Sequence, residues 1–116
     1  MAYNEQLAAR VREMLTAFNI NDIVEKKMFG GLCFMVRGKM CVVVRSDSLL
    51  LRLAPDEFQK AVNEKTLDPM LRIGRTMTGF GYVSEERLKT KRTLHHWVDL
   101  ALQCNKQLPA PKKKRR

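Results

Sequence analysis

The segment Lys26–Val44 reads KKMFGGLCFMVRGKMCVVV and decides the fold. Gly30 and Gly31 interrupt its first apolar run, where residues without a Cβ atom can take positive φ and let the backbone bend or bulge. The polar sequence Arg37-Gly38-Lys39 then separates two short apolar runs, as a hairpin turn does. The segment therefore predicts two antiparallel strands joined by a tight turn.

Further strand signals lie on both sides of this hairpin. Leu49–Leu53 is apolar and short enough for a third strand. Ile23–Phe29 is charged at its centre, so we expect at most a weak strand at the edge of the sheet. Residues 76–83 alternate apolar with small or polar side chains, which predicts another strand. Whether residues 67–74 form one more strand stays open, because Pro69 lies inside them.

Three segments have the residue pattern of helices. The first and last, near residues 4–18 and 94–102, place apolar side chains on one helical face. These side chains are Leu7, Val11, Met14, Leu15 and Phe18 in the first, and Leu94, Trp97, Val98, Ala101 and Leu102 in the last. Pro55 favours the start of a short helix to about Glu64, and Ser84-Glu85-Glu86 resembles the start of the last helix. Amphipathic helices need an apolar surface to cover, so we predict an α+β two-layer sandwich, an antiparallel sheet covered by helices.

Length and composition predict one folded domain followed by a tail. At 116 residues, 45% of them hydrophobic, the chain can bury a core of its own. No apolar stretch approaches the ~20 residues that span a bilayer, and the first residues lack the pattern of a signal peptide. We expect a folded domain over residues 1–109, a disordered basic tail over residues 110–116, and a cytoplasmic protein without membrane association.

The cysteines and histidines do not have the spacing of a metal or redox site. Cys33, Cys41 and Cys104 form no C-x-x-C pair, so we expect buried, reduced thiols and no disulfide between Cys33 and Cys41. His95 and His96 are adjacent on a helix, where their side chains point about 100° apart and cannot clamp one metal ion. We therefore predict no metal, no cofactor and no catalytic residues.

Glycines, methionines and phenylalanines have structural interpretations and open alternatives. Gly30-Gly31 and the set Gly74, Gly79 and Gly81 match neither a phosphate loop nor a dinucleotide fingerprint, so turns and bulges explain them. Methionine most often fills gaps in a core, although a pliable partner surface is the alternative. The methionines in question are Met28, Met35, Met40, Met70 and Met77. Phe29, Phe34 and Phe80 are candidates for stacking on a strand, but core packing explains all three equally well.

The basic residues are unevenly distributed. Five of the 22 lysines and arginines form the tail Lys112, Lys113, Lys114, Arg115 and Arg116, which carries half of the +10 net charge. Such a flexible cationic segment attracts nucleic acid without reading sequence, and a solubilising role is the alternative. A further set could extend a basic face if the fold brings its members together: Arg10, Arg12, Arg72, Arg75, Lys89, Lys91 and Arg92.

Several motifs, in order along the chain, resemble those of one family. They are Lys27-Met28-Phe29-Gly30-Gly31-Leu32, Gly38-Lys39-Met40-Cys41, residues 74–83 (GRTMTGFGYV), and a final helix that bears Trp97. Over roughly residues 5–109 the chain resembles the N-terminal domain of the TfoX/Sxy family, bacterial proteins named for regulators of natural competence. The resemblance implies the order helix, three strands, helix, two strands, helix, and a role in regulation of transcription.

These observations favour a binding module over an enzyme. We expect a small cytoplasmic regulatory or protein-interaction domain of the TfoX type, with a protein partner and without enzymatic activity. The alternative is an accessory protein that binds nucleic acid through its basic tail. Homodimerisation through an exposed strand edge is also compatible with the sequence, which does not decide it.

Overall fold

The structure is a computed structural model that describes residues 3–28, 30–72 and 75–108; for residues 71, 72 and 75–78 it describes the backbone alone. One antiparallel sheet contains six strands in the order β1-β2-β3-β4-β6-β5. The elements are α1 (Glu5–Ala17), β1 (Ile23–Met28), β2 (Gly31–Val36), β3 (Lys39–Val44), β4 (Ser48–Arg52), α2 (Pro55–Asn63), β5 (Asp68–Arg72), β6 (Arg75–Ser84), the 3-10 helix η1 (Glu85–Leu88) and α3 (Lys91–Gln107).

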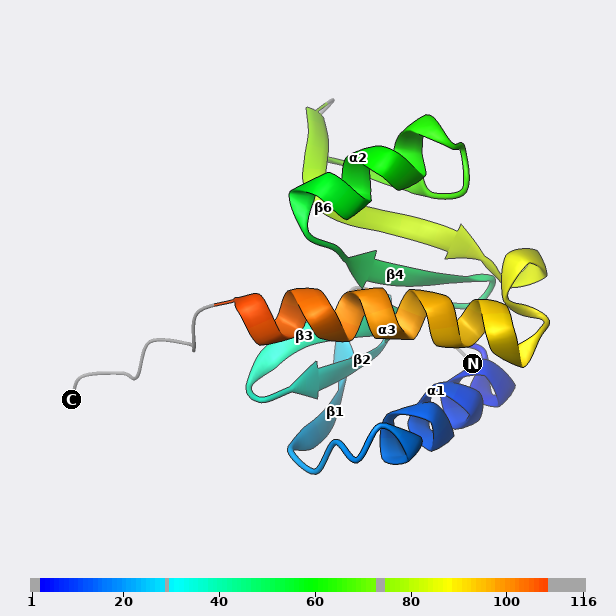
Figure 1. The fold of residues 1–116 in the computed structure, drawn as a ribbon. Helices are drawn as coiled ribbons and strands as arrows, with labels where there is room; N and C mark the ends of the chain where they lie inside the picture. The colour runs from blue at the N-terminus through cyan, green and yellow to red at the C-terminus, as the bar shows by residue number, and fades with distance from the viewer. Residues whose placement is uncertain (1–2, 29, 73–74, 109–116) are drawn as a thin grey trace.

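The helices form one layer and the sheet forms the other (Figure 1). The long helix α3 lies across the middle of the sheet, where it contacts β3 and β4. On one side of α3, α1 packs beside it, and on the other side α2 packs on β6. The predicted α+β two-layer sandwich is therefore confirmed, and the three α-helices share one face of the sheet.

The number of strands before α2 is four, not the three that the family resemblance implies. The additional strand is β1, which pairs with β2 along its whole length, from Ile23 opposite Val36 to Met28 opposite Gly31. Because β1 is an edge strand, its charged centre can remain in solvent, as we expected for a weak edge element. Pro69 is also compatible with a strand, since β5 forms the opposite edge of the sheet.

Local sequence signals set the helix boundaries. The side chain of Asn4 accepts a hydrogen bond of 2.9 Å from the Leu7 backbone nitrogen and caps α1. Pro55 is the first residue of α2, as predicted. The predicted helix start at Ser84 leads into η1 instead, and α3 begins only at Lys91, where Thr90 provides the cap. The last helix therefore starts later than the acidic residues suggested.

The core lies between the helices and the sheet. Apart from the half-buried Phe18, every apolar helix residue expected to face inward in α1 and α3 is buried there. The sheet contributes alternate residues, including Phe34, Leu49 and Leu51, each fully buried at 0% exposure. Among the described residues, no helix is both long and apolar enough to cross a bilayer.

Candidate functional site

The second face of the sheet, which none of the described helices covers, carries an apolar cluster of its own. Side chains alternate between the two faces of a strand, so the residues between the core positions point away from the helices. At the centre of this face lie Cys33 on β2, Val43 on β3 and Leu50 on β4. We call this side of the sheet the open face.

Half-buried side chains shield the centre of the open face. They are Met28, Met35, Met40, Met70, Phe80 and Tyr82, and they come from five of the six strands. They reduce the exposure of Cys33 and Val43 to 0% and that of Leu50 to 1%, although the part of the chain that the structure describes places no second layer above them. Methionine side chains are flexible and can repack around a partner. The open face is thus an apolar surface with an adaptable cover.

One apolar side chain of the open face is largely in solvent. Val24 on β1 lies opposite Met35 in the β1-β2 register, which places both on the same side of the sheet. It is 49% exposed. Val24 therefore extends the apolar area of the open face to the edge of the sheet. Continuous exposed apolar areas are typical of interaction surfaces.

Positive charge and aromatic rings lie together on the open face. Arg52 faces Phe80 across β4 and β6, and its Cζ atom is 5.1 Å from the centre of the Phe80 ring. The Cζ atom of Arg45 is 5.3 Å from the centre of the Tyr82 ring. Both distances fit cation-π contacts. Lys26 adds a third cation opposite Cys33, so the open face combines apolar, aromatic and cationic groups.

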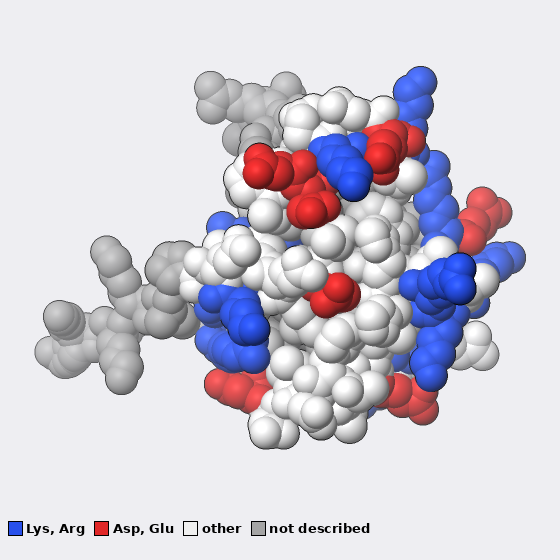
Figure 2. All heavy atoms as spheres, viewed as in Figure 1, with Lys and Arg blue, Asp and Glu red and all other residues white. Residues whose placement is uncertain are grey.

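The helix-bearing face has a different charge pattern. Figure 2 shows acidic side chains gathered over α2, which carries Asp56 and Glu57 in its first turn, and basic side chains along the side where η1 and α3 begin. The surface over the middle of α3 is mostly uncharged. The helix side also has a cation-aromatic contact, since the Cζ atom of Arg12 on α1 lies 5.9 Å from the centre of the buried Phe34 ring.

Comparison with known protein families assigns the chain to one of them. Residues 13–105 match the family described as the TfoX N-terminal domain. The chain belongs to this family. No curated protein and no solved structure matches it. The family assignment identifies the fold described above as a TfoX N-terminal domain.

The cysteines of the TfoX N-terminal domain are free and buried, as predicted. A register shift between Phe34 and Met35 sets Cys41 on the helix side of the sheet, whereas Cys33 lies on the open face. The sheet therefore separates these two thiols, in agreement with the prediction of no disulfide. Burial raises the pKa of Cys33 to about 11 and that of Cys41 to about 12, so both are poor nucleophiles at neutral pH.

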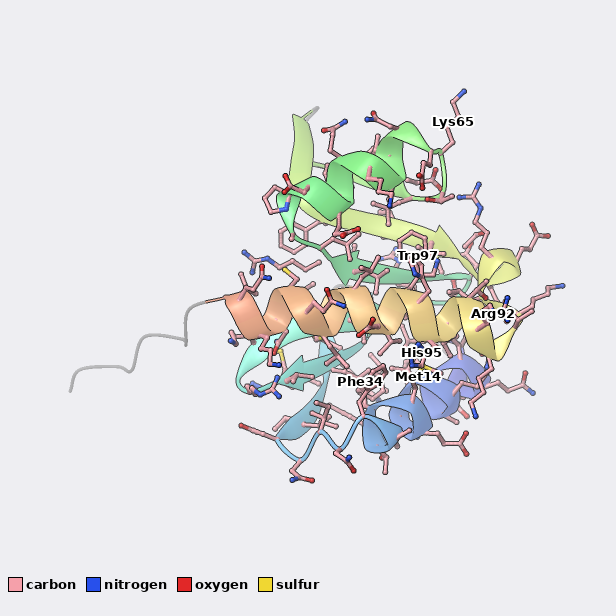
Figure 3. The ribbon with its side chains drawn as sticks, in the orientation of Figure 1. Met14, Phe34, Lys65, Arg92, His95 and Trp97 are labelled. Atoms are coloured by element: carbon pink, nitrogen blue, oxygen red, sulfur yellow. The ribbon has the colours of Figure 1, made fainter. Side chains whose placement is uncertain are left out.

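The histidines are surface residues with ring contacts. The rings of His95 and Phe18 are 4.9 Å apart, and those of His96 and Trp97 are 5.1 Å apart. His95 also borders a cleft of about 280 Å³ between α1 and α3, next to Met14 (Figure 3). Among the described residues, no three His, Cys, Asp or Glu side chains are grouped closely enough to hold a metal ion.

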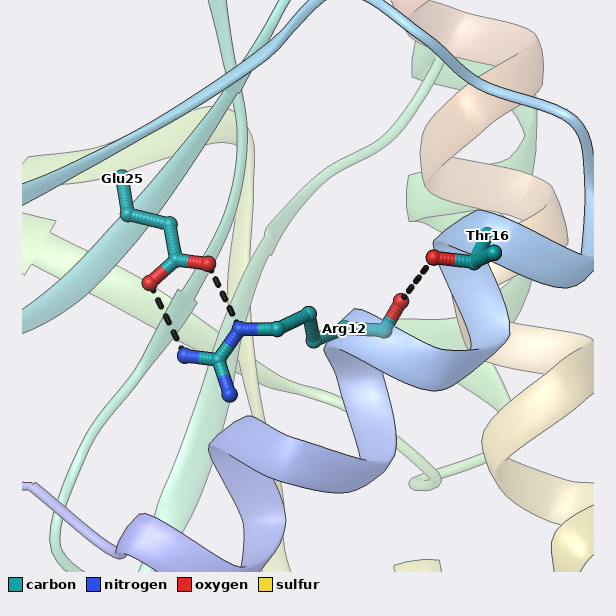
Figure 4. Close-up of polar contacts among 3 residues, drawn as sticks. All are labelled: Arg12, Thr16 and Glu25. Atoms are coloured by element: carbon teal, nitrogen blue, oxygen red, sulfur yellow. Dashed lines mark hydrogen bonds and ion pairs between the residues drawn. The ribbon is translucent and has the colours of Figure 1, made fainter.

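The basic residues singled out from the sequence do not form one face. Arg10 and Lys91 border the cleft between α1 and α3, and Arg10 Nη2 donates a 3.4 Å hydrogen bond to the Lys89 carbonyl oxygen. Arg12 instead forms a bidentate pair with Glu25 on the helix side of β1, with nitrogen-oxygen distances of 2.6 and 2.8 Å (Figure 4). The side chains of Arg72 and Arg75, like the tail Lys112–Arg116, lie outside the described residues.

The open face was not recognised from the sequence as a surface. The strand signal placed Phe80 correctly on β6, but its position on the open face, together with that of Tyr82, requires knowledge of which face the helices cover. Phe34 is core, and Phe29 lies outside the described residues. The pattern of aromatic residues two positions apart at Phe80 and Tyr82 was the available signal, since such residues share one side of a strand.

Proposed function

We propose that this TfoX N-terminal domain is a regulatory module that docks a macromolecular partner on its open face. The observation that carries the proposal is the one-sided placement of the helices, which, among the described residues, leaves a second apolar cluster covered only by side chains of the sheet itself. Four methionines, Phe80, Tyr82 and the exposed Val24 surround that cluster. A surface of this composition gains free energy when a partner covers it.

We further propose that the domain does not catalyse a reaction. The raised pKa values of Cys33 and Cys41 keep these thiols protonated, and a protonated thiol is a weak nucleophile. On the open face, Lys26 lies opposite Cys33, and Arg45 and Arg52 contact aromatic rings, so these cations have structural or binding contacts that do not require catalysis. Turnover of a metabolite by the purified protein would contradict this part of the proposal.

Site-specific photo-crosslinking in cells tests the docking surface. A photoreactive amino acid at Val24 or Lys26 reports contacts of the open face, and the same group at Lys60 or Arg92 reports contacts of the helix side. We expect the open-face positions to give the dominant crosslinked species. Digestion of each species with nuclease or protease then identifies the class of the partner.

The proposed surface would be contradicted if Lys60 and Arg92 gave as much crosslinked product as Val24 and Lys26, or if only Lys60 and Arg92 gave crosslinks. Lys60 is a suitable control because it lies on the exposed side of α2, and Arg92 because it lies exposed in the first turn of α3. Both variants leave the core and the open face unchanged, so a difference between the two sets reports position and not stability.

The second candidate function is attraction of nucleic acid by the basic tail. Five consecutive cations, Lys112–Arg116, support it because each cation near a phosphate releases a counterion. Affinity for duplex DNA is then expected to fall steeply as salt rises and to drop when residues 112–116 are deleted. Unchanged affinity after the deletion would contradict a role for the tail.

A further inference from the structure

We propose that the open face binds single-stranded nucleic acid, with bases stacked on Phe80 and Tyr82 and the backbone phosphates held by the cations beside these rings. This inference rests on the proposed function, because it assigns a class of partner to the same surface. Its basis is the placement of rings, glycines and cations on β4 and β6.

The two rings form a stacking platform on one strand. Phe80 and Tyr82 are two residues apart on β6, and both belong to the open-face cluster. Alternate residues of a strand are about 7 Å apart, so each ring can receive its own base. Both rings are half-buried, which fixes them in the surface while leaving part of each ring accessible. Aromatic rings held in this way stack on bases with little dependence on sequence.

Close packing and backbone conformation explain why glycines lie before and between the two aromatic residues of β6, at Gly79 and Gly81. A Cβ atom at Gly81 would lie 2.5 Å from Leu67 Cδ2 on the helix side, so a larger residue does not fit there. Gly79 has φ of +94°, a conformation that L-residues rarely adopt. Glycine at both positions allows the strand to pack closely on its helix side while the aromatic side chains project from the other side.

The resulting sequence resembles a known RNA-binding strand. Residues 79–83 read Gly-Phe-Gly-Tyr-Val, which follows the central part of the RNP1 motif of RNA-recognition domains, with Tyr82 at an aromatic position. In those domains the motif lies on the uncovered face of an antiparallel sheet, and its aromatic residues stack on bases. The strand order here is different, so the likeness is one of local surface and not of fold.

The cations beside the rings are placed to contact phosphates. The Cζ atoms of Arg52 and Arg45 lie over the Phe80 and Tyr82 rings, 5.1 and 5.3 Å from the ring centres, so each guanidinium covers part of a ring face, adds positive charge and offers a second plane on which a base can stack. Lys26 adds charge on the opposite side of the cluster. Asp68 on β5 lies opposite Tyr82 and places an acid on the same face. The positive charge of Lys26, Arg45 and Arg52 beside the rings favours a polyanion over a basic partner.

The geometry favours single strands over a duplex. Stacking on a ring requires a base whose own face is free, and in a duplex neighbouring pairs cover these faces. A broad sheet also does not enter a groove as a helix or a two-stranded ribbon does. The expected ligand is therefore an unpaired segment of RNA or DNA. Comparison of an RNA probe with a DNA probe shows whether the domain prefers ribose or deoxyribose.

Fluorescence anisotropy with the full-length chain tests the proposal. The probes are labelled 12-nucleotide oligo(U), oligo(dT) and a 12-base-pair DNA duplex, each measured at several salt concentrations. We expect the single strands to bind more tightly than the duplex. Phe80→Leu and Tyr82→Leu are each expected to weaken single-strand binding about 10-fold with little change in salt dependence, because they remove stacking and no charge. Arg52→Ala is expected to make the slope of log affinity against log salt concentration less steep, by about the amount that one phosphate contact contributes.

Matched variants separate stacking from folding and from the tail. Tyr82→Phe keeps the ring and is expected to retain affinity. Phe18→Leu removes a half-buried ring from the helix side and is also expected to bind as the wild type does. Deletion of residues 112–116 is expected to lower the affinity of the protein for all three probes. Thermal unfolding of every variant identifies any that fail to fold.

Three results would overturn the proposal: wild-type affinity in both leucine variants at positions 80 and 82, equal loss in Phe18→Leu, or duplex binding as tight as single-strand binding. Absence of single-strand binding together with a protein crosslinked at Val24 would also overturn it. In that last case the proposed docking function would stand, with a protein as the partner of the open face.

Discussion

Gly31 shows how a single residue fixes the local packing of the central hairpin. A Cβ atom at this position would overlap the Val44 carbonyl oxygen, which belongs to the backbone and cannot turn away. We expect Gly31→Ala to lower the free energy of unfolding by about 2–3 kcal/mol, the usual cost of overpacking. Urea denaturation measures this loss.

The neighbouring glycine is the control for that substitution. Gly30 has φ of +72°, and a Cβ atom there would meet only the Arg45 side chain, at 3.6 Å. Gly30→Ala is therefore expected to lower the free energy of unfolding by about 1 kcal/mol, the cost of the left-handed conformation. A larger loss in Gly30→Ala than in Gly31→Ala would contradict the close approach of Gly31 to β3.

The Arg12–Glu25 pair couples α1 to β1 in a pH-dependent way. The hydrogen bond from Arg12 lowers the pKa of Glu25 from its ordinary value of 4.5. A carboxylate with a lowered pKa contributes stability above its unfolded-state pKa and loses it as the pH falls through the lowered value. We expect a double-mutant cycle with Arg12→Ala and Glu25→Ala to give a coupling of about 0.5 kcal/mol at neutral pH. A coupling that is unchanged in strong acid would contradict the ionic character of the pair.

The thiols offer a chemical test of burial. Cys33, Cys41 and Cys104 are all buried, and burial raises the pKa of each thiol. In the folded protein at pH 8 we expect none of the three to react readily with a thiol reagent, and in urea all three to react. Rapid modification of Cys33 in the folded protein would show that the methionine cover of the open face is looser than described.

At the scale of elements, the end of α3 is anchored to the β2-β3 hairpin by polar contacts. Asn105 is 1% exposed, and its Nδ2 atom donates a 3.0 Å hydrogen bond to the Val36 carbonyl oxygen. Lys39 Nζ donates hydrogen bonds of 2.7 and 2.9 Å to the carbonyl oxygens of Asn105 and Leu108. These bonds satisfy carbonyl groups that a helix end leaves unpaired.

We expect Asn105→Leu to lower the free energy of unfolding by about 2 kcal/mol, because the Val36 carbonyl loses a buried donor. The exposed Gln103 on the same helix is the control, and Gln103→Leu is expected to change stability by no more than about 0.5 kcal/mol. Chemical denaturation of both variants measures the difference. Equal effects would contradict the anchoring role of Asn105.

The elements themselves could largely be predicted from the sequence because each depends on local patterns. Apolar spacing identified α1 and α3, and the glycine turn at Arg37-Gly38-Lys39 identified the β2-β3 hairpin. The boundary between η1 and α3 was missed because Ser84 and the acids after it suit the start of either kind of helix. The fourth strand before α2 was uncertain because an edge strand needs no apolar periodicity.

At the scale of the molecule, the open face could not be predicted from local patterns. Strand alternation shows that a strand has two sides, but only the packing of α1, α2 and α3 decides which side becomes core. The same packing explains why Met14 lies in the helix-covered core while Met28, Met35, Met40 and Met70 lie on the open face. Core filling is therefore confirmed for Met14, whereas a partner surface at the open-face methionines stays a prediction.

The four open-face methionines provide the most direct test of the docking surface. Methyl-labelled methionine in the full-length protein gives separate NMR signals for the open face and for Met14, which is 6% exposed beneath the helices. On titration with oligo(U), we expect the signals of Met28, Met35, Met40 and Met70 to shift and that of Met14 to stay in place. Unmoved open-face methionines, or shifts that appear at Met14 instead, would contradict the assignment of the open face as the surface that binds single-stranded nucleic acid.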